Sequence, residues 1–273
     1  MQHFSISPFE MMASPWRHRD LVRVLVKREV LGRYRGSVLG ILWSFFNPVF
    51  MLAVYTFVFS VVFRARWSEA GDESRAKFAL ILFAGLLIFN LFAECLNRAP
   101  TLILNNVNFV KKIVFPLEIL PWVAFGTALF HALISFGVWL LFSLAVIGPP
   151  MLTVLWLPLL LLPLLLLTLG LSWLLAALGV FLRDVAQMVG IVTTTLMFLS
   201  PIFYPLAAIP ERYQPLILCN PLTLIIEQAR GVLIFDTPPV WSGWTVLTVV
   251  AALVAWLGFA LFQKTRKGFA DVL

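Results

Sequence analysis

The sequence predicts an all-α integral membrane protein. We expect six transmembrane helices, an N-terminal amphipathic helix at the membrane interface, and re-entrant helices between the fifth and sixth spans. Of the 273 residues, 61% are apolar and 12% are charged, whereas soluble domains average about 25% charged residues. The apolar residues gather in runs that are long enough to cross a bilayer, and basic residues collect near the ends of these runs. This composition excludes a water-soluble domain.

Six apolar runs approach or exceed the roughly 20 residues that a transmembrane helix needs. We predict spans at residues 38–63, 78–96, 117–147, 152–182, 185–199 and 241–262. Gly148, Pro149 and Pro150 end the third run, and Arg183 with Asp184 separates the fourth from the fifth. The transmembrane domain therefore covers residues 38–263, between a cytoplasmic N-terminal segment of residues 1–37 and a cytoplasmic tail of residues 264–273.

The basic residues predict that both termini are cytoplasmic. Fourteen of the 20 lysines and arginines fall in segments on the side of the N-terminus, and six fall on the other side. Such an excess marks the cytoplasmic side, so the net charge of +7 implies no nucleic-acid partner. The first 16 residues lack an apolar core followed by a small-residue cleavage site, so we expect no signal peptide. Cys95 and Cys219 fall at opposite faces, and we expect no disulfide between them.

Residues 16–34 predict an amphipathic helix that lies on the inner leaflet. Its apolar face is expected to hold Leu21, Val22, Val24, Leu25 and Val26. Arg19, Arg23 and Lys27 follow at four-residue spacing on the other face, where each attracts anionic lipid by roughly 1 kcal/mol. A solvated basic face that only sets the topology is the alternative. Glu29 and Arg33 have the spacing of an ion pair within one helix.

Residues 200–240 are too polar and too rich in proline for a simple span. Prolines break or begin helices, so we predict short re-entrant helices beside a cavity that opens to the outside; a longer external loop packed on the surface is the alternative. Glu227 and Arg230 are expected to pair on one helix face. Candidates for this external gate are Pro201, Pro205, Asn220, Pro221, Glu227 and Arg230.

Five stretches occur in an order that resembles the permeases of type-2 ABC exporters, and above all the subgroup that exports lipid-linked polysaccharides (O-antigen, capsule and teichoic-acid chains). They are LGRYRGSVLGILWSFFNPV, NNVNFVKKIVFPLEILP, Arg183–Asp184, FLSPIFYP, and Asn220–Pro221 followed by Glu227 and Arg230. The similarity covers residues 21–262. It implies an inner-membrane homodimer of six-span permeases, docked on two copies of a separate ATPase that binds ATP and Mg²⁺, with a glycan channel along the dimer interface.

The energy source is expected to lie outside this chain. The sequence contains no G-x-x-x-x-G-K-[ST] phosphate-binding loop, so we expect no cofactor here. The loop of residues 101–116 is short, cytoplasmic and bounded by Pro116, and in the family that it resembles this loop is the coupling helix gripped by the ATPase. The alternative is a purely structural turn whose two lysines, Lys111 and Lys112, only set the membrane topology. The coupling candidates are Asn105, Asn106, Asn108, Lys111 and Lys112.

The first span contains an Asn-Pro pair that would bend it. Such a break is tolerated where a helix lines a wet or polar path, and nearby aromatic rings suit the apolar faces of sugars. Alternatively, some of these aromatic residues, such as Trp43, belong to the aromatic belt at the membrane interface. The candidates for the translocation path are Trp43, Phe46, Asn47, Pro48, Phe50 and Tyr55, with Tyr204 at the outer gate.

Catalytic chemistry is sparse in the sequence. His131 has no Cys, Asp or Glu at ligand spacing in the sequence, so we expect a hydrogen-bonded packing histidine, with a metal ligand or proton relay as the alternative. We expect Glu94 to pair with Arg98 four residues later. We predict no catalytic residue and no metal site. Two alternatives remain open: a type-2 exporter of a drug or small lipid, and a membrane enzyme that acts on lipid-linked sugars, for which the spans offer little beyond Glu94.

Overall fold

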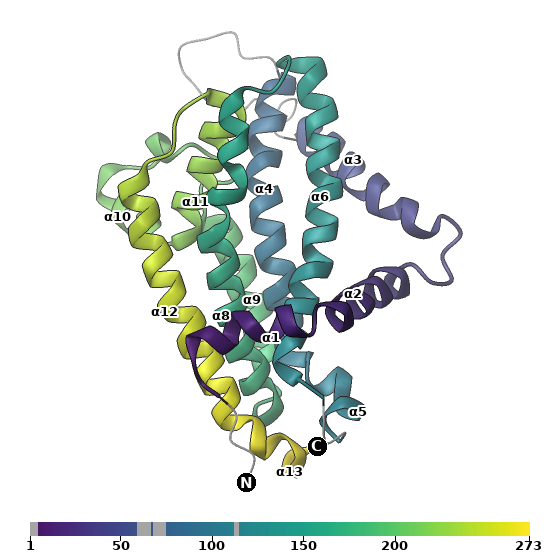
Figure 1. Ribbon diagram of the computed structural model, residues 1–273. Coiled ribbons are helices and arrows are strands. Elements are labelled where there is room, and N and C mark those ends of the chain that lie inside the picture. The colour runs from purple at the N-terminus through teal and green to yellow at the C-terminus, as the bar shows by residue number, and fades with distance from the viewer. Residues whose placement is uncertain (1–4, 59–66, 68–74, 112–114) are drawn as a thin grey trace.

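The structure is a computed structural model, and it describes residues 5–58, 67, 75–111 and 115–273. Every regular element in these ranges is a helix, as Figure 1 shows. The all-α class predicted from the sequence is therefore confirmed. Most of the polar loop that follows the first span lies outside the described residues.

Five helical segments among the described residues are long and apolar enough to cross a membrane: Gly40–Val58, Ala76–Thr101, Leu117–Val146, Leu152–Phe181 and Trp241–Val272. Their main helices are α3 (Trp43–Tyr55), α4 (Arg75–Arg98), α6 (Leu120–Val146), α8 (Leu162–Phe181) and α12 (Trp241–Thr265). They coincide with five of the six predicted spans, because length and hydropathy are properties of the local sequence.

The region between α8 and α12 is less regular. The predicted fifth span forms α9 (Val185–Leu199), which has 15 residues. It is followed by α10 (Gln214–Leu218) and α11 (Pro221–Arg230). The segments Glu211–Leu218 and Pro221–Phe235 meet at an angle of 97°, as in a broken span or a re-entrant loop. The described residues therefore contain five candidate spans, or six if this bent pair counts as one.

The spans pack through small residues, and α4 is the most buried of them. In Figure 1 α4 stands between α6 and the helices that follow. Where α8 and α12 cross, a methyl group on Gly258 would collide with the backbone of Gly170, and one on Gly170 would collide with the backbone of Ala255. Without a hydrophobic driving force between helices in lipid, such close approach supplies the packing energy.

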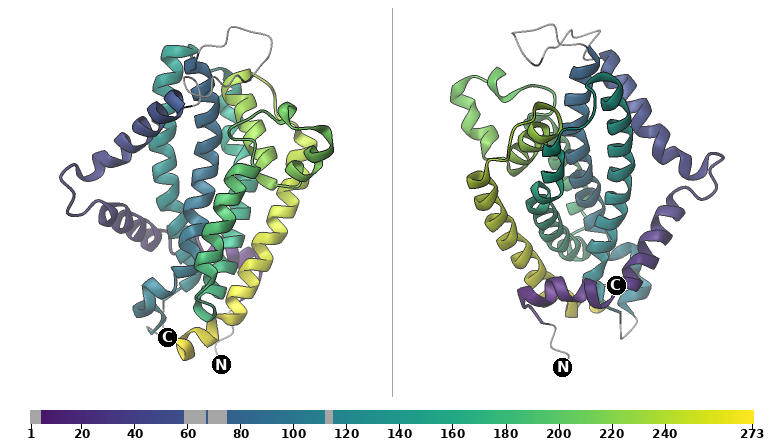
Figure 2. Two further views of the ribbon diagram at one scale, coloured as in Figure 1. Left: turned by 180° about the vertical axis from the view of Figure 1, so that it is seen from behind. Right: turned by 45° about the horizontal axis from the view of Figure 1, so that its top comes forward.

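Two helices precede the first span. They are α1 (Pro8–Arg17) and α2 (Arg19–Arg33), which meet at His18. The right view of Figure 2 shows α1 running across one end of the bundle and α2 leading from it to the side. The predicted amphipathic helix corresponds to α2, and α1 is an additional element. Leu25 and Val30 are buried, but Val24 is 64% exposed, so its assignment to the apolar face is wrong. At 100° per residue, Val24 points almost opposite to the buried side.

The remaining elements are short. The α-helices are α5 (Val107–Val110), α7 (Leu157–Leu160) and α13 (Phe269–Val272). Turns of 3₁₀-helix cover Gly40–Leu42, Ala99–Thr101, Leu104–Asn106, Leu117–Ile119, Leu152–Trp156, Leu206–Ala208, Glu211–Tyr213 and Arg266–Gly268, and Gly231–Phe235 is π-helical. The first and last helices, α1 and α13, lie at the same end of the bundle (Figure 1).

Candidate functional site

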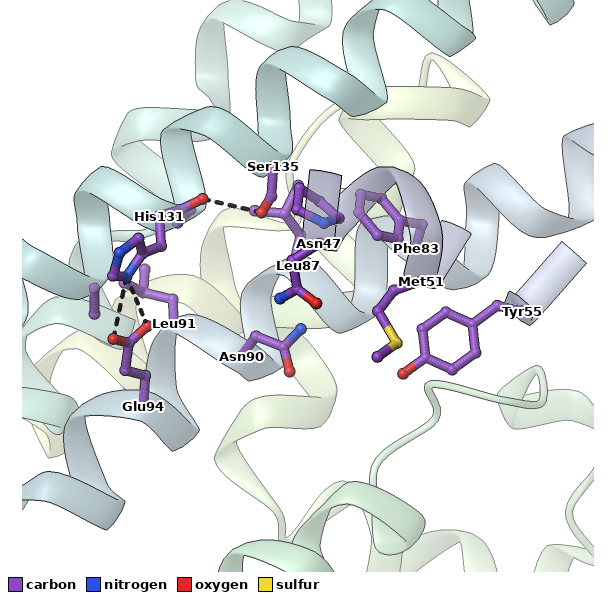
Figure 3. A pocket seen from close by; sticks show the side chains of 13 residues that line it. Asn47, Met51, Tyr55, Phe83, Leu87, Asn90, Leu91, Glu94, His131 and Ser135 are labelled. Carbon is purple, nitrogen blue, oxygen red and sulfur yellow. Dashed lines mark hydrogen bonds and ion pairs between the residues drawn. The ribbon is translucent and has the colours of Figure 1, made fainter. Parts of the chain in front are cut away.

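A polar cavity lies between α3, α4 and α6, inside the membrane-spanning bundle (Figure 3). Its volume is about 90 Å³. It is lined by Asn47, Pro48, Met51 and Tyr55 from α3, by Phe83, Leu87, Asn90, Leu91 and Glu94 from α4, and by Ala128, His131, Ala132 and Ser135 from α6. Amides, a carboxylate, an imidazole and hydroxyl groups thus meet at membrane depth, where polar side chains are costly and typically serve function.

Glu94 and His131 form one end of this cavity, as Figure 3 shows. Nδ1 of His131 lies 3.1 and 3.2 Å from the two carboxylate oxygens of Glu94. Arg33, the last residue of α2, donates from Nη1 to Oε1 of Glu94 at 2.5 Å. The same Nη1 lies 3.1 Å from Nδ1 of His131. An acid, an imidazole and a guanidinium from three helices therefore close this end of the cavity.

These contacts correct two expected ion pairs. The sequence predicts Glu94 with Arg98 and Glu29 with Arg33, each pair within one helix. In the structure Glu94 pairs with Arg33 instead, and Nη2 of Arg98 donates to Oε2 of Glu29. The hydroxyl of Thr127 on α6 also donates to Oε2 of Glu29, at 3.3 Å. The partners exchange because α2 packs on α6 and its charged side chains reach α4, so that residues meet which sequence spacing does not relate.

Sequence reasoning missed part of the cavity. His131 is hydrogen-bonded as expected, but its partner is Glu94, which reaches it from α4 and which sequence spacing did not indicate. Asn90 and Ser135 are absent from the predicted site. A signal was present in the sequence, because Asn90 and Glu94 are four residues apart, as are His131 and Ser135, and such pairs share one face of a helix.

The predicted path residues of the first span divide into two groups. Asn47, Pro48 and Tyr55 line the cavity. Trp43, Phe46 and Phe50 do not, and their side chains are 48, 45 and 64% exposed. Pro48 lies inside α3, and since proline has no backbone N–H, the helix lacks one internal hydrogen bond where it borders the cavity.

Arg230 of α11 holds together the region predicted as the external gate. It is 1% exposed. Its Nε donates to the carbonyl of Ile81 on α4 at 3.0 Å, and its Nη2 donates to the carbonyl of Ile202 at 2.7 Å. Its Nη1 donates to the carbonyl of Pro201 and, at 3.2 Å, to Oε1 of Glu227. The predicted pair of Glu227 with Arg230 is therefore confirmed.

The space around Arg230 is shaped to hold a guanidinium. The group lies 4.4 Å from the ring centroid of Trp67, a distance at which a cation is attracted to the face of the ring. A methyl group at Gly85 of α4 would collide with the guanidinium. Because glycine has no side chain, Gly85 leaves room for the guanidinium of Arg230. The backbone carbonyls around the guanidinium accept the hydrogen bonds that water would otherwise accept.

The other predicted gate residues lie at the start of α11 and in the segment before it. Pro221 is the first residue of α11, and Asn220 caps that helix by accepting a hydrogen bond from the backbone N–H of Leu222 at 3.0 Å. Pro201 and Pro205 lie in the irregular segment that links α9 to α10. Tyr204 of this segment donates its hydroxyl to the carbonyl of Phe198 at 2.7 Å and does not line the cavity.

The predicted coupling loop forms 3₁₀ turns and α5, and it packs on α2. The rings of Phe109 and Phe115 stack with centroids 4.1 Å apart, and both contact the small core formed by Leu25, Ile119 and Val123. The outer side of the loop is polar, with Asn105, Asn108 and Lys111 exposed and Asn106 half-buried. Lys112 lies outside the described residues. The loop and α2 therefore pack against each other through one shared hydrophobic core.

The basic face of α2 is open. Arg19, Arg23 and Lys27 are exposed. Arg23 forms an ion pair at 3.4 Å with Asp20, and both side chains are mostly in solvent. An ion pair with this exposure contributes little to stability, so the face is free to meet a charged surface.

The long apolar helices and the polar cavity among them define a multi-span membrane protein. The sequence pattern of the ABC-2 type transporter family matches residues 20–234. The chain belongs to this family.

Three curated relatives match nearly the whole chain. The O-antigen export system permease protein RfbA of Myxococcus xanthus is 30% identical over 258 residues, which are 94% of this chain and 96% of the relative. The protein of the same name from Klebsiella pneumoniae is 27% identical over 93% of this chain and 95% of its own length. The polysialic acid transport protein KpsM of Escherichia coli is 25% identical over 90% of this chain and 93% of its own length.

Proposed function

We propose that this chain is the membrane permease of an ATP-driven exporter that carries a lipid-linked polysaccharide across the inner membrane. The observation that carries the proposal is the agreement among the relatives. Proteins named for the export of two different polysaccharides, O-antigen and polysialic acid, each match at least 90% of the chain. A polymer is the cargo that these relatives have in common.

The proposed assembly contains two copies of this chain and two copies of an ATPase, with both termini in the cytoplasm. The coupling loop supports it, because an exposed polar surface on a packed loop suits the docking of a second protein. That loop lies at the end of the bundle that also carries α1, α2 and α13 (Figure 1). The side of α3 with Trp43, Phe46 and Phe50, which the rest of the described chain leaves exposed, supports a second copy beside it.

The glycan path is proposed to open at α3. A cavity of about 90 Å³ holds only about three waters at roughly 30 Å³ each, so a sugar chain needs α3 to move away from α4 and α6. Gly36 and Gly40, in the link between α2 and α3, have φ angles of +84° and +51°. Since glycine adopts such angles without steric cost, this link is suited to act as the hinge.

One observation favours a second candidate, an exporter of a drug or small lipid. A second cavity, apolar and about 470 Å³ in volume, lies between the C-terminal parts of α3 and α6 and the N-terminal part of α4. Its lining includes Val49, Leu52, Phe57, Leu80 and Phe142, which suits an acyl chain better than a sugar. The third class, an enzyme that acts on lipid-linked sugars, rests on Glu94, and unchanged substrate turnover in Glu94→Gln would remove its support.

The test is to deplete the protein in its host and to extract lipid-linked glycan from the inner membrane. The proposal expects a long polymer to accumulate inside the cell and to disappear from the surface, with recovery when the wild-type gene is restored. An unchanged glycan profile together with a changed profile of small amphiphiles would favour the second candidate.

A further inference from the structure

A buried acid lies where the coupling loop continues into α6. Glu118 belongs to the 3₁₀ turn Leu117–Ile119, whose three residues are all buried. A carboxylate that is removed from water needs partners for its charge and for both of its oxygens. The partners of Glu118 therefore identify what holds the end of the loop in place.

These partners come from three other parts of the chain. The hydroxyl of Ser14 on α1 donates to Oε1 of Glu118 at 3.0 Å, and Nη1 of Arg266 donates to Oε2 at 2.6 Å. The indole N–H of Trp173 on α8 donates to the backbone carbonyl of Glu118 at 3.0 Å. The end of the loop is thus bound to the first helix, to α8 and to the segment that follows α12.

Arg266 binds the end of the loop at two points. Besides its ion pair with Glu118, its Nη2 donates to the backbone carbonyl of Phe115 at 2.6 Å. The side chains of Arg266 and Glu118 are 12 and 11% exposed, so salt screens this pair less than an ion pair at the surface. Because the guanidinium is planar and rigid, two contacts fix its orientation relative to the loop. We call Arg266, Glu118 and the carbonyl of Phe115 the terminal clamp.

The segment that carries Arg266 is itself fixed to the bundle. The 3₁₀ turn Arg266–Gly268 continues α12 directly, and α13 follows it. Phe269 of α13 is 0% exposed, and its ring centroid lies 5.4 Å from that of Phe262 on α12 and 5.9 Å from that of Phe181 on α8. In Figure 1, α13 lies at the same end of the bundle as α5. Arg266 therefore connects the loop to α12 through a packed segment.

The terminal clamp also connects to the exposed part of the loop. The rings of Phe115 and Phe109 are stacked, with an angle of 7° between their planes, and Phe109 lies in α5 next to the exposed Asn108. A protein that binds the polar outer side of the loop and displaces α5 therefore pushes on Phe115. From the carbonyl of Phe115 the displacement reaches Arg266 and, through it, α12.

We propose that Arg266 is a positioning residue for transport, because the terminal clamp makes the coupling loop and α12 move together when the ATPase acts on the loop. The inference rests on the proposed function, in which this loop receives the ATPase. It adds the C-terminal segment to the coupling machinery, since Arg266 and α13 lie beyond residues 20–234, which match the family. A buried ion pair often adds little net stability compared with apolar residues of similar size, so the geometry favours transmission of movement over stabilisation alone.

The first experiment separates transmission from assembly. Arg266→Gln removes the charge but keeps a side chain that can donate to one acceptor, and Arg266→Lys restores the charge without the planar guanidinium. Lys267→Gln changes an exposed neighbour and is the matched control. Each variant is expressed in the depleted host. The amount of inserted protein, the ATPase that co-purifies, ATP hydrolysis by the purified complex and surface glycan are then measured.

The terminal clamp predicts that Arg266→Gln binds the ATPase and hydrolyses ATP as the parent does, while surface glycan per inserted protein falls several-fold. Arg266→Lys is expected to recover part of the export, and the control is expected to retain all of it. Unchanged export in Arg266→Gln would overturn the proposal. A fall of inserted protein, ATPase binding and export in the same proportion would also overturn it, since that pattern belongs to a purely structural ion pair.

The second experiment does not depend on the cargo. Amide hydrogen exchange of the purified chain is followed by mass spectrometry, with and without the bound ATPase subunit. Because exchange reports local opening, the terminal clamp predicts that ATPase binding slows exchange several-fold in residues 101–111 and also in residues 266–272. The slowing in residues 266–272 should disappear in Arg266→Gln and persist in Lys267→Gln.

The possible outcomes separate this inference from the proposed function. Slower exchange in the loop of the parent chain with no change in residues 266–272 would refute the terminal clamp and leave the proposed assembly intact. Slowing in residues 266–272 that persists in Arg266→Gln would come from direct contact with the ATPase and would also refute it. No change in either segment would contradict the docking of the ATPase on this loop, and the inference would fall with the proposed assembly.

Discussion

Arg33 at the end of α2 donates to Glu94 near the C-terminal end of α4, with 2.5 Å between Nη1 and Oε1. The two residues are 61 positions apart in sequence. Since α2 packs on the coupling loop through Leu25, and Glu94 lines the polar cavity, this contact joins the surface proposed to receive the ATPase to the proposed glycan path.

Removing this ion pair should weaken the attachment of α2 to α4 by a small amount. The side chain of Arg33 is 52% exposed and that of Glu94 is 20% exposed, so a double-mutant cycle of Arg33→Ala and Glu94→Gln is expected to give a coupling of about 0.5–1 kcal/mol. Unfolding of the purified protein in detergent measures it. Arg23→Ala is the control, because its pair with Asp20 is fully open to solvent, and no measurable loss is expected there.

The same pair should matter more for export than for stability. Arg33→Glu places two acids together and is expected to reduce surface glycan strongly, while Arg33→Glu combined with Glu94→Arg restores part of it. Surface glycan per amount of membrane-inserted protein is the measurement. Equal loss in the single and double variants would show that charge complementarity between these positions has no role.

Removing the buried arginine should be among the most destabilising changes in the chain. Arg230→Met leaves three backbone carbonyls without their donor, at a cost of about 1–3 kcal/mol for a buried group left unsatisfied, and it leaves Glu227, whose side chain is 37% exposed, without its ion pair. Gly85→Ala should also destabilise, since its methyl group collides with the guanidinium. Gly137→Ala on α6 is the matched control, because no atom lies within 4 Å of the added methyl. Thermal unfolding midpoints in detergent compare the three.

The polar lining of the cavity should be needed for transport rather than for folding. Asn47→Leu with Asn90→Leu replaces two amides of the lining by apolar groups, and we expect at least a tenfold loss of surface glycan, about 1.4 kcal/mol in a rate-limiting barrier, with little change in the amount of inserted protein. Ser242→Leu, an exposed polar residue of α12, is the control. Full export in the Asn47 and Asn90 variant would remove this cavity from the proposed path.

The coupling loop should transmit energy through its exposed surface. Lys111→Glu reverses a charge on an exposed side chain, so stability is expected to stay within about 0.5 kcal/mol of the parent, while ATPase co-purification and export fall together. Lys267→Glu, another exposed lysine at the same end of the bundle, is the control. Retained ATPase binding and export in the Lys111 variant would contradict the assignment of this loop.

The sequence by itself determined the features that depend on neighbouring residues. The long apolar runs become α3, α4, α6, α8 and α12 because a lipid-facing backbone must satisfy its own hydrogen bonds as a helix. Asn220 with Pro221 begins a helix, and Glu227 pairs with Arg230, because capping and three-residue spacing act within one turn. Pro48 enters a helix that borders the cavity, as the Asn-Pro pair predicts.

Only the tertiary structure decided which side chains meet across helices. Glu94 has Arg98 four residues away on its own helix, yet the position of α2, which packs on α6, pairs Glu94 with Arg33. The packing of α4 against α6 brings Glu94 to His131. Arg230 looks like a surface residue in the sequence, yet the missing side chain of Gly85 and the carbonyls of Ile81 and Ile202 make its burial possible. Such contacts depend on the angles at which helices cross and on the space between them. Neither quantity can be read from the spacing of residues within one helix.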